Sequence, residues 1–216
     1  MNKLILIAIL TTLSMNASAS SDTTQTNLKS FLSFGTGYNK NKATIKGDST
    51  TPTTLDNSYS WSIEYGLSKQ INNYLNIGVG YEFGKSETKK ESATQKDIVT
   101  LPTMGANLYI NYTKYNKITP YAGVGVIYTL ADSAKWKFTD KTTNTTATFK
   151  SSSGNFGGQF KLGLKYNITD NFNLGLEYKY TKIDINLNKI NDYYLANDVE
   201  TTSKINSLSL KLTTEF

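Results

Sequence analysis

Apolar and polar residues alternate along eight separate segments of this chain. The pattern is clearest from residue 59 to residue 68, where Tyr59, Trp61, Ile63, Tyr65 and Leu67 alternate with Ser60, Ser62, Glu64, Gly66 and Ser68. A period of two is typical of a β-strand with two different faces. The eight segments are 28–38, 59–69, 75–84, 98–112, 119–130, 155–167, 172–181 and 204–216. The pattern therefore predicts an all-β protein.

The polar face of these segments carries the charge. Its charged residues are Lys29, Glu64, Glu82, Lys161, Lys165, Glu177, Lys179, Lys211 and Glu215. A lysine that faces lipid at the middle of a bilayer costs ~2–4 kcal/mol, which would explain its exclusion from an apolar, lipid-facing side. Glycines crowd the same polar face, as a narrow interior requires. Segment 98–112 is the least regular, because Val99, Leu101 and Tyr109 fall on its nominally polar face.

The connections between these segments alternate in length. The short ones are 70–74, 113–118 and 168–171, and the long ones are 39–58, 85–97, 131–154 and 182–203. Outer-membrane barrels have short periplasmic turns and long extracellular loops. Aromatic residues gather at the segment ends, where we expect them at the two membrane interfaces. The interface residues we predict are Tyr59, Trp61, Tyr81, Tyr128, Tyr166, Phe172, Tyr178 and Tyr180. Together these features predict an eight-stranded antiparallel up-and-down transmembrane β-barrel.

Both ends of the chain indicate export. Residues 1–19 combine Lys3, an apolar run and a small-residue cleavage site at Ala17-Ser18-Ala19, which is typical of a secretory signal peptide. A tail at 20–27 and a barrel at 28–216 would follow. The last segment alternates up to Phe216, and this ending resembles the recognition signal of bacterial outer-membrane barrels. We therefore expect the barrel-assembly machinery to be a partner and Phe216 to be the assembly signal.

Composition narrows the range of functions. The chain has no cysteine, so no disulfide framework operates, and no histidine, which removes the commonest catalytic base and metal ligand. We expect no cofactor and no bound metal. All basic residues are lysines, and the formal net charge is +6. These lysines are scattered and form no known nucleic-acid motif, so we expect no nucleic-acid partner.

One segment resembles a known family. Ile118-Thr119-Pro120-Tyr121-Ala122-Gly123-Val124-Gly125-Val126 is similar to the "PY-x-G-x-G" strand of small eight-stranded outer-membrane barrels. That family includes the OmpA transmembrane domain, OmpX and the opacity-type surface antigens. With the signal peptide and Phe216, the resemblance covers essentially the whole mature chain. It implies a barrel in the bacterial outer membrane, expected to be a monomer, in contact with outer-membrane lipid and lipopolysaccharide. The barrel enzymes of that membrane use a catalytic histidine, which this chain lacks, so we expect no enzyme.

The charged face predicts an ionic network in the lumen. If the turn at 70–74 closes a hairpin, Glu64 and Glu82 lie nearly opposite each other and need a cation or a shared proton. We expect lysines to reach across to carboxylates and to plug the lumen. The predicted members are Glu64, Glu82, Lys161, Lys165, Glu177, Lys179, Lys211 and Glu215. A general acid/base pair of Glu64 and Glu82 is a weaker alternative, since a narrow lumen gives a polymer no access.

These observations favour a non-enzymatic, surface-exposed structural or adhesin-like protein. It would act through its four long loops, which could bind host or cell-surface ligands. A small pore or ligand channel across the outer membrane is the alternative from a transport class. A secreted carrier with an apolar interior shares the period of two, but Phe216 and the interface aromatics disfavour it.

Overall fold

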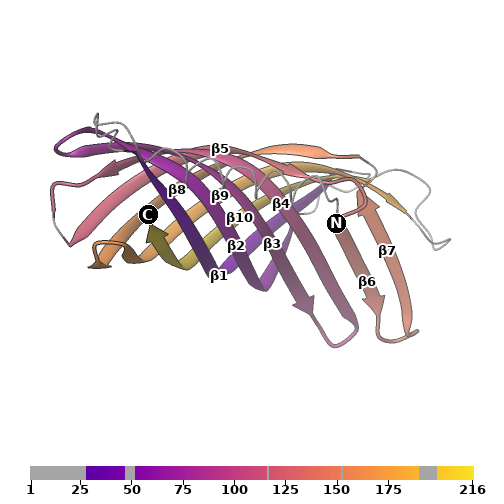
Figure 1. Cartoon of the computed structure of the whole chain (residues 1–216). Coiled ribbons are helices and arrows are strands. Elements are labelled where there is room, and N and C mark those ends of the chain that lie inside the picture. Colours follow the sequence, from indigo (N-terminus) through magenta and orange to yellow (C-terminus); the bar gives the residue numbers. More distant parts are fainter. Residues whose placement is uncertain (1–27, 47–51, 116, 152, 190–198) are drawn as a thin grey trace.

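The computed structural model describes residues 28–46, 52–115, 117–151, 153–189 and 199–216. The expected signal peptide, 1–19, and tail, 20–27, lie outside these described residues. Eight long antiparallel strands pair in a closed ring, in the order β10-β1-β2-β3-β4-β5-β8-β9, and β9 pairs back to β10 (Figure 1). Their bounds are β1 Leu28–Lys46, β2 Pro52–Asn72, β3 Leu75–Glu91, β4 Gln95–Tyr112, β5 Ile118–Thr129, β8 Asn155–Thr169, β9 Phe172–Lys189 and β10 Val199–Glu215. The predicted eight-stranded antiparallel barrel is confirmed.

Within the described ranges, no helix is long and apolar enough to cross a membrane.

The alternating residues face opposite sides of the barrel wall, one set outward and the other toward the interior. On β2, Ile63 is 46% exposed, whereas its neighbour Glu64 is 1% exposed. Apolar side chains cover the outer wall because only that wall can meet lipid, and polar side chains fill the interior. Of the eight aromatic residues predicted at the interfaces, Tyr128 and Tyr180 are half-buried and the other six are exposed. In this part of the barrel the interior is therefore polar, the reverse of a water-soluble fold.

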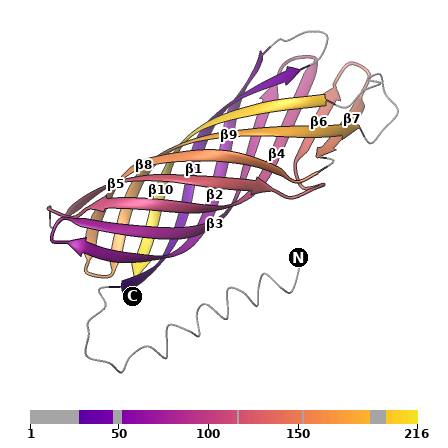
Figure 2. The same ribbon diagram turned by 90° about the horizontal axis from the view of Figure 1, so that it is seen from above.

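The expected long loop at 131–154 is mostly a β-hairpin. Its two strands are β6 (Lys135–Asp140) and β7 (Thr145–Ser151). The hairpin pairs with β4 on one side and with β9 on the other. It projects at the end of the barrel opposite the C-terminus (Figure 2). Because β5 ends at Thr129 and β8 begins at Asn155, β6 and β7 take the place of these two strands in the wall.

The other expected long loops are also largely strand. Only 92–94 separates β3 from β4, and the gaps between β1 and β2 and between β9 and β10 are 47–51 and 190–198. The prediction of four long loops was therefore wrong in extent. Beyond the apolar wall the alternation can reverse: on β9, Ile183 and Ile185 are buried, whereas Lys182 and Asp184 are exposed. Backbone pairing needs no outward apolar side chains, and threonine favours strands. The short connections lie together at the other end, close to the C-terminus (Figure 2).

One lysine lies on the outer wall at the short-turn end. Lys69 of β2 pairs with Leu28 and Ile77, and all three side chains are exposed. A lysine at the edge of an apolar wall can extend its ammonium group to the aqueous boundary. The outward face of segment 59–69 is therefore apolar only as far as Leu67, because its last residue, Lys69, is charged.

Candidate functional site in the barrel lumen

Six ionic side chains meet on the inner face of the barrel. They are Glu64, Glu82, Lys161, Glu177, Lys179 and Lys211. The strand registers bring them together: Glu64 on β2 lies opposite Glu82 on β3, and Lys161 on β8 lies opposite Lys179 on β9. Like charges face each other within each hairpin, so the compensating contacts run across the lumen.

Lys161 is the centre of this network and is 0% exposed. Its Nζ forms an ion pair with Oε2 of Glu82 and lies 3.5 Å from Oε2 of Glu64. It also donates a hydrogen bond of 2.7 Å to the hydroxyl of Tyr109. That hydroxyl in turn donates to Oε1 of Glu64. One ammonium group therefore compensates two adjacent carboxylates, which is necessary because an unpaired buried charge is strongly destabilising.

Two further lysines complete the charge balance. Nζ of Lys211 lies 2.9 Å from Oε2 of Glu64 and 3.1 Å from Oε2 of Glu177. Nζ of Lys179 lies 2.7 Å from Oε1 of Glu82. The three lysines and three glutamates carry equal and opposite charge, so the network is neutral as a whole.

Amide groups fill the remaining hydrogen-bond positions. Nδ2 of Asn107 donates to Oε1 of Glu64 at 2.9 Å and to Oε2 of Glu82 at 3.3 Å. Nε2 of Gln159 donates to Oδ1 of Asn107 at 2.6 Å. These bonds fix the carboxylates, because each amide is itself held by a neighbour.

Two residues expected in the network lie apart from it. Nζ of Lys165 lies over the rings of Phe31 and Tyr121, at 5.7 and 5.4 Å from their centroids. Glu215 is 3.8 Å from the ammonium group of Lys29. Both line a cavity of about 700 Å³ at the short-turn end of the barrel. Alternation along a strand gives the face of a residue but not its height in the barrel, which explains the difference.

Tyr109 and Tyr121 also belong to the network, although the alternation of residues did not predict this. The hydroxyl of Tyr121 donates to Oε2 of Glu177 at 2.8 Å, as Tyr109 does to Glu64. Glycines make room for both rings: a Cβ at Gly163 would lie 2.4 Å from the ring of Tyr121, and one at Gly123 would lie 2.7 Å from that of Tyr109. Tyrosines on a glycine-rich polar face were the available signal.

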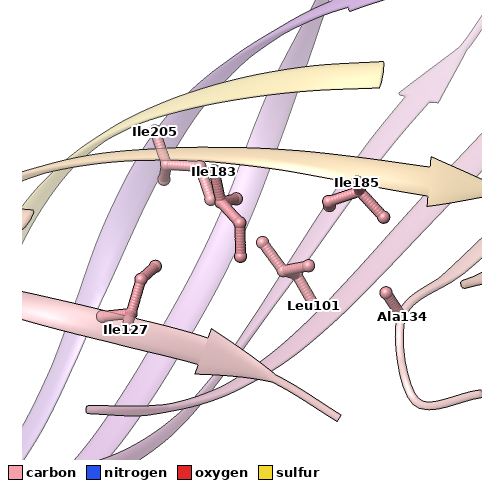
Figure 3. Close-up of a cluster of buried hydrophobic side chains, with 6 residues drawn as sticks. All are labelled: Leu101, Ile127, Ala134, Ile183, Ile185 and Ile205. Carbon is pink, nitrogen blue, oxygen red and sulfur yellow. The ribbon is translucent and has the colours of Figure 1, made fainter. Parts of the chain in front are cut away.

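A second layer, which is apolar, lies in the lumen next to the ionic network. Figure 3 shows its side chains converging from several strands. The members are Leu101, Ile127, Ala134, Ile183, Ile185 and Ile205, all at most 4% exposed. A cavity of about 30 Å³ lies between the layers, bordered by Gln159 and Lys179 on one side and by Leu101 and Ile127 on the other. We name these six residues the apolar layer.

The two layers follow each other along the lumen. Glu64 and Glu82 are each bound by two lysines and an amide. Among the residues whose placement is described, no cluster of acidic, histidine or cysteine side chains is arranged to hold a metal ion.

Comparison with known proteins gives a family and a set of similar structures. The family model described as "outer membrane protein beta-barrel domain" matches residues 5–212. Neisserial surface protein A is 16% identical with a TM-score of 0.48, covering 87% of this chain and 97% of that one. OprG from Pseudomonas aeruginosa is 12% identical with a TM-score of 0.49, covering 87% and 96%. Ail, the attachment invasion locus protein of Yersinia pestis, is 14% identical with a TM-score of 0.40, covering 85% and 97%. No curated protein sequence matches significantly.

Proposed function

This chain belongs to the outer membrane protein β-barrel domain family and resides in the bacterial outer membrane, and we propose that it is a non-enzymatic, adhesin-like surface protein whose lumen is plugged. The observation that carries this proposal is the presence of two successive layers of side chains in the lumen, the ionic network and the apolar layer. Since solutes have no open path through the barrel, its contacts with partners would be made on its outside. The short turns face the periplasm and the projecting strands face the cell exterior, as in other barrels of this membrane.

The plug has two physically different parts. The ionic network is neutral and saturated with hydrogen bonds, so an entering ion gains no free partner there. The apolar layer offers an ion no hydrogen bonds at all, and burying an unpaired charge there is costly. An ion would have to overcome both barriers in series.

The exterior end is built to project from the membrane. The hairpin of β6 and β7 pairs with β4 through six residue pairs, from Gln95↔Asp140 to Thr100↔Lys135. Its tip carries Asp140, Lys141 and a run of threonines, all polar. A stiff sheet presents such residues at a fixed position, which reduces the ordering cost when a host or cell-surface ligand binds.

Conductance in a planar bilayer tests the closed lumen and the alternative of a small pore. We expect the wild-type barrel to conduct at most weakly. Lys161→Met should increase conductance, and combining it with Leu101→Ala should increase it further, because each change opens one of two layers. A large wild-type conductance that neither change alters would refute the plug and favour the pore. Lys29→Met, at the exposed pair with Glu215, is the matched control that removes one lysine outside both layers.

Adhesion of bacteria tests the surface role. The full chain is expressed in the outer membrane of a non-adherent host, and binding to cultured cells is counted. In a shortened variant, residues 139–146 are replaced by Asn-Gly, which makes a two-residue turn between Phe138 and Ala147, a pair opposite each other in the register. We expect the wild type to promote binding and the shortened variant, at equal surface amount, to lose most of it. No gain from the wild type over the empty host would reject the adhesin-like role.

A further inference from the structure

The cavity at the short-turn end of the barrel contains a lysine that has no acidic partner. Lys165 of β8 lines this cavity, whose volume is about 700 Å³. In the part of the chain that the structure describes, no carboxylate forms an ion pair with its ammonium group. Lys161, Lys179 and Lys211, by contrast, each pair with at least one glutamate. The ionic network therefore leaves the charge of Lys165 uncompensated.

Aromatic rings hold the ammonium group of Lys165 in position. Its Nζ lies 5.7 Å from the ring centroid of Phe31 and 5.4 Å from that of Tyr121. Both rings are buried and pack with Tyr109, whose centroid is 6.3 Å from that of Phe31 and 6.0 Å from that of Tyr121. An ammonium group has three N–H donors, and a cation–π contact attracts the charge without an oxygen acceptor. The N–H groups of Lys165 can therefore still donate to a ligand.

The charged side chains around the cavity carry an excess of positive charge. At its inner end, Lys211 and Glu64 already belong to the ionic network. Glu215 lies 3.8 Å from the ammonium group of Lys29. Four lysines and three acids line the cavity in all: Lys29, Lys117, Lys165, Lys211, Glu64, Asp170 and Glu215. A ligand with one negative charge would balance them.

Amide and hydroxyl groups make up much of the remaining lining. Examples are Ser68, Asn76, Asn111, Thr113, Thr119 and Asn173. Within the described residues, the buried Oδ1 of Asn76 has no hydrogen-bond partner. Leaving a buried acceptor without a donor is costly, and a hydroxyl group of a ligand would supply that donor. The volume of the cavity is also in the range of small-molecule sites, roughly 300–1,000 Å³.

We propose that this cavity binds a small organic anion that also carries hydroxyl groups, such as a sugar acid or a sugar phosphate. Its carboxylate or phosphate accepts hydrogen bonds from Nζ of Lys165, and one of its hydroxyl groups donates to Oδ1 of Asn76. Because the short turns face the periplasm and the ionic network lies at the inner end, the ligand enters from the periplasm and returns to it. The inference goes beyond the adhesin-like role and does not depend on it.

Isothermal titration calorimetry of the refolded full chain in zwitterionic detergent micelles tests the ligand class. The probes are gluconate, glucose 6-phosphate and, as their uncharged counterpart, glucose. We expect saturable binding of at least one of the two anions. Glucose should bind about tenfold more weakly or worse, because it cannot form a charge-assisted hydrogen bond with Lys165. The anion that binds more tightly identifies the acidic group as a carboxylate or a phosphate.

A lysine variant tests whether the ammonium group of Lys165 carries the binding. Lys165→Met removes its charge and keeps a flexible side chain beside the rings of Phe31 and Tyr121. The matched control is Lys69→Met, which removes one exposed lysine at the same end of the barrel but on its outer wall. We expect affinity for the anion to fall about tenfold in Lys165→Met and to stay unchanged in Lys69→Met.

A second pair of variants retains Lys165 and tests the same site. Thr119 of β5 lies directly opposite Lys165 of β8 and also lines the cavity. Thr119→Glu supplies the missing carboxylate, so Lys165 should pair with it and anion binding should be lost. Thr119→Gln has the same length without the charge and should keep most of the binding. Unfolding in urea reports on folding, and Thr119→Glu should be at least as resistant as Thr119→Gln because it gains an ion pair.

Four results would overturn the proposal. No saturable binding of either anion at millimolar concentration would show that the cavity holds only water. Equal binding of glucose and glucose 6-phosphate would remove the role of the charge. Equal weakening by Lys165→Met and Lys69→Met would indicate a response to net charge alone. Equal binding by folded Thr119→Glu and Thr119→Gln would place the anion away from Lys165.

Discussion

Glu64 and Glu82 lie directly opposite each other on β2 and β3, and the ammonium group of one lysine, Lys161, forms an ion pair with both. Because this lysine comes from β8, the contact crosses the lumen instead of running along the wall. The network therefore ties distant parts of the ring together, and several consequences can be measured.

Removing Lys161 should destabilise the barrel strongly. Lys161→Met leaves two carboxylates side by side in a buried position, and breaking a buried pair on one side costs about 3–5 kcal/mol. Urea unfolding of the refolded protein, followed by the mobility shift on unboiled gels, measures the change. Lys29→Met is the control: its ion pair with Glu215 is exposed and 3.8 Å long, so we expect at most ~1 kcal/mol. Equal losses in the two variants would contradict the central position of Lys161.

A methyl group at Gly163 should also destabilise the barrel. A Cβ there would lie 2.4 Å from the ring of Tyr121, which would have to move and weaken its bond to Glu177. Overpacking of this kind costs about 1–3 kcal/mol. Gly158→Ala is the matched change on the same strand, where the added Cβ meets open space, and it should be neutral or slightly stabilising. Thermal unfolding of both variants decides between these expectations.

The projecting strands should respond to pH through Asp97, which lies on the part of β4 that pairs with β6. Burial raises the pKa of this carboxyl above its usual value, against a hydrogen bond from Gln95. The folded state then holds the proton more tightly than the unfolded state, so this contribution to stability is present at acid pH and is lost as the pH rises through the raised pKa. We expect larger protection factors of the β4 and β6 amides, meaning hydrogen exchange rates corrected for the intrinsic effect of pH, below the usual aspartate range than at neutral pH. Asp97→Asn should flatten this dependence, and an unchanged profile would refute it.

Substitution of Phe216 should affect assembly of the barrel in the outer membrane but not the stability of the folded protein. Its ring is 57% exposed, whereas its backbone exchanges two hydrogen bonds with Ser30, at 2.8 and 2.9 Å. Phe216→Ala keeps both backbone bonds, so the refolded protein should unfold at about the same urea concentration as the wild type. If the assembly machinery reads the terminal ring, much less folded protein should reach the outer membrane. Normal amounts in that membrane would argue against Phe216 as the signal.

The sequence predicted the features of the strands that contact with lipid imposes. It missed the features that lipid does not affect. Lipid excludes charge from alternate positions, so the pattern around Trp61 and Ile63 reveals the barrel and its eight strands. Beyond the membrane the alternation in β6 and β7 is short, four residues each in Lys135-Trp136-Lys137-Phe138 and Ala147-Thr148-Phe149-Lys150, and was not recognised as strand. Its apolar residues Trp136 and Phe149 pack against the apolar layer instead of facing lipid. Within the lumen, the pattern gave the correct face of Lys165 and Lys161 but not the height at which the carboxylates of the other strands lie, so it did not show that, of these two lysines, only Lys161 reaches Glu64 and Glu82. Tyr109 and Tyr121 could be predicted as partners of the carboxylates only with knowledge of which glycines lie beside their rings.

Two neighbouring positions in the barrel wall are occupied by different strands at different heights, first by β5 and β8 and then by β6 and β7. At the membrane, the ring contains β5 and β8; outside it, the same two places are filled by a single contiguous stretch, 131–154. Without this stretch, β4 and β9 would each end in an unpaired edge exposed to neighbouring molecules. The sequence of the hairpin can therefore change as one block without altering any strand that spans the membrane, provided that the pairs with β4 and β9 are kept.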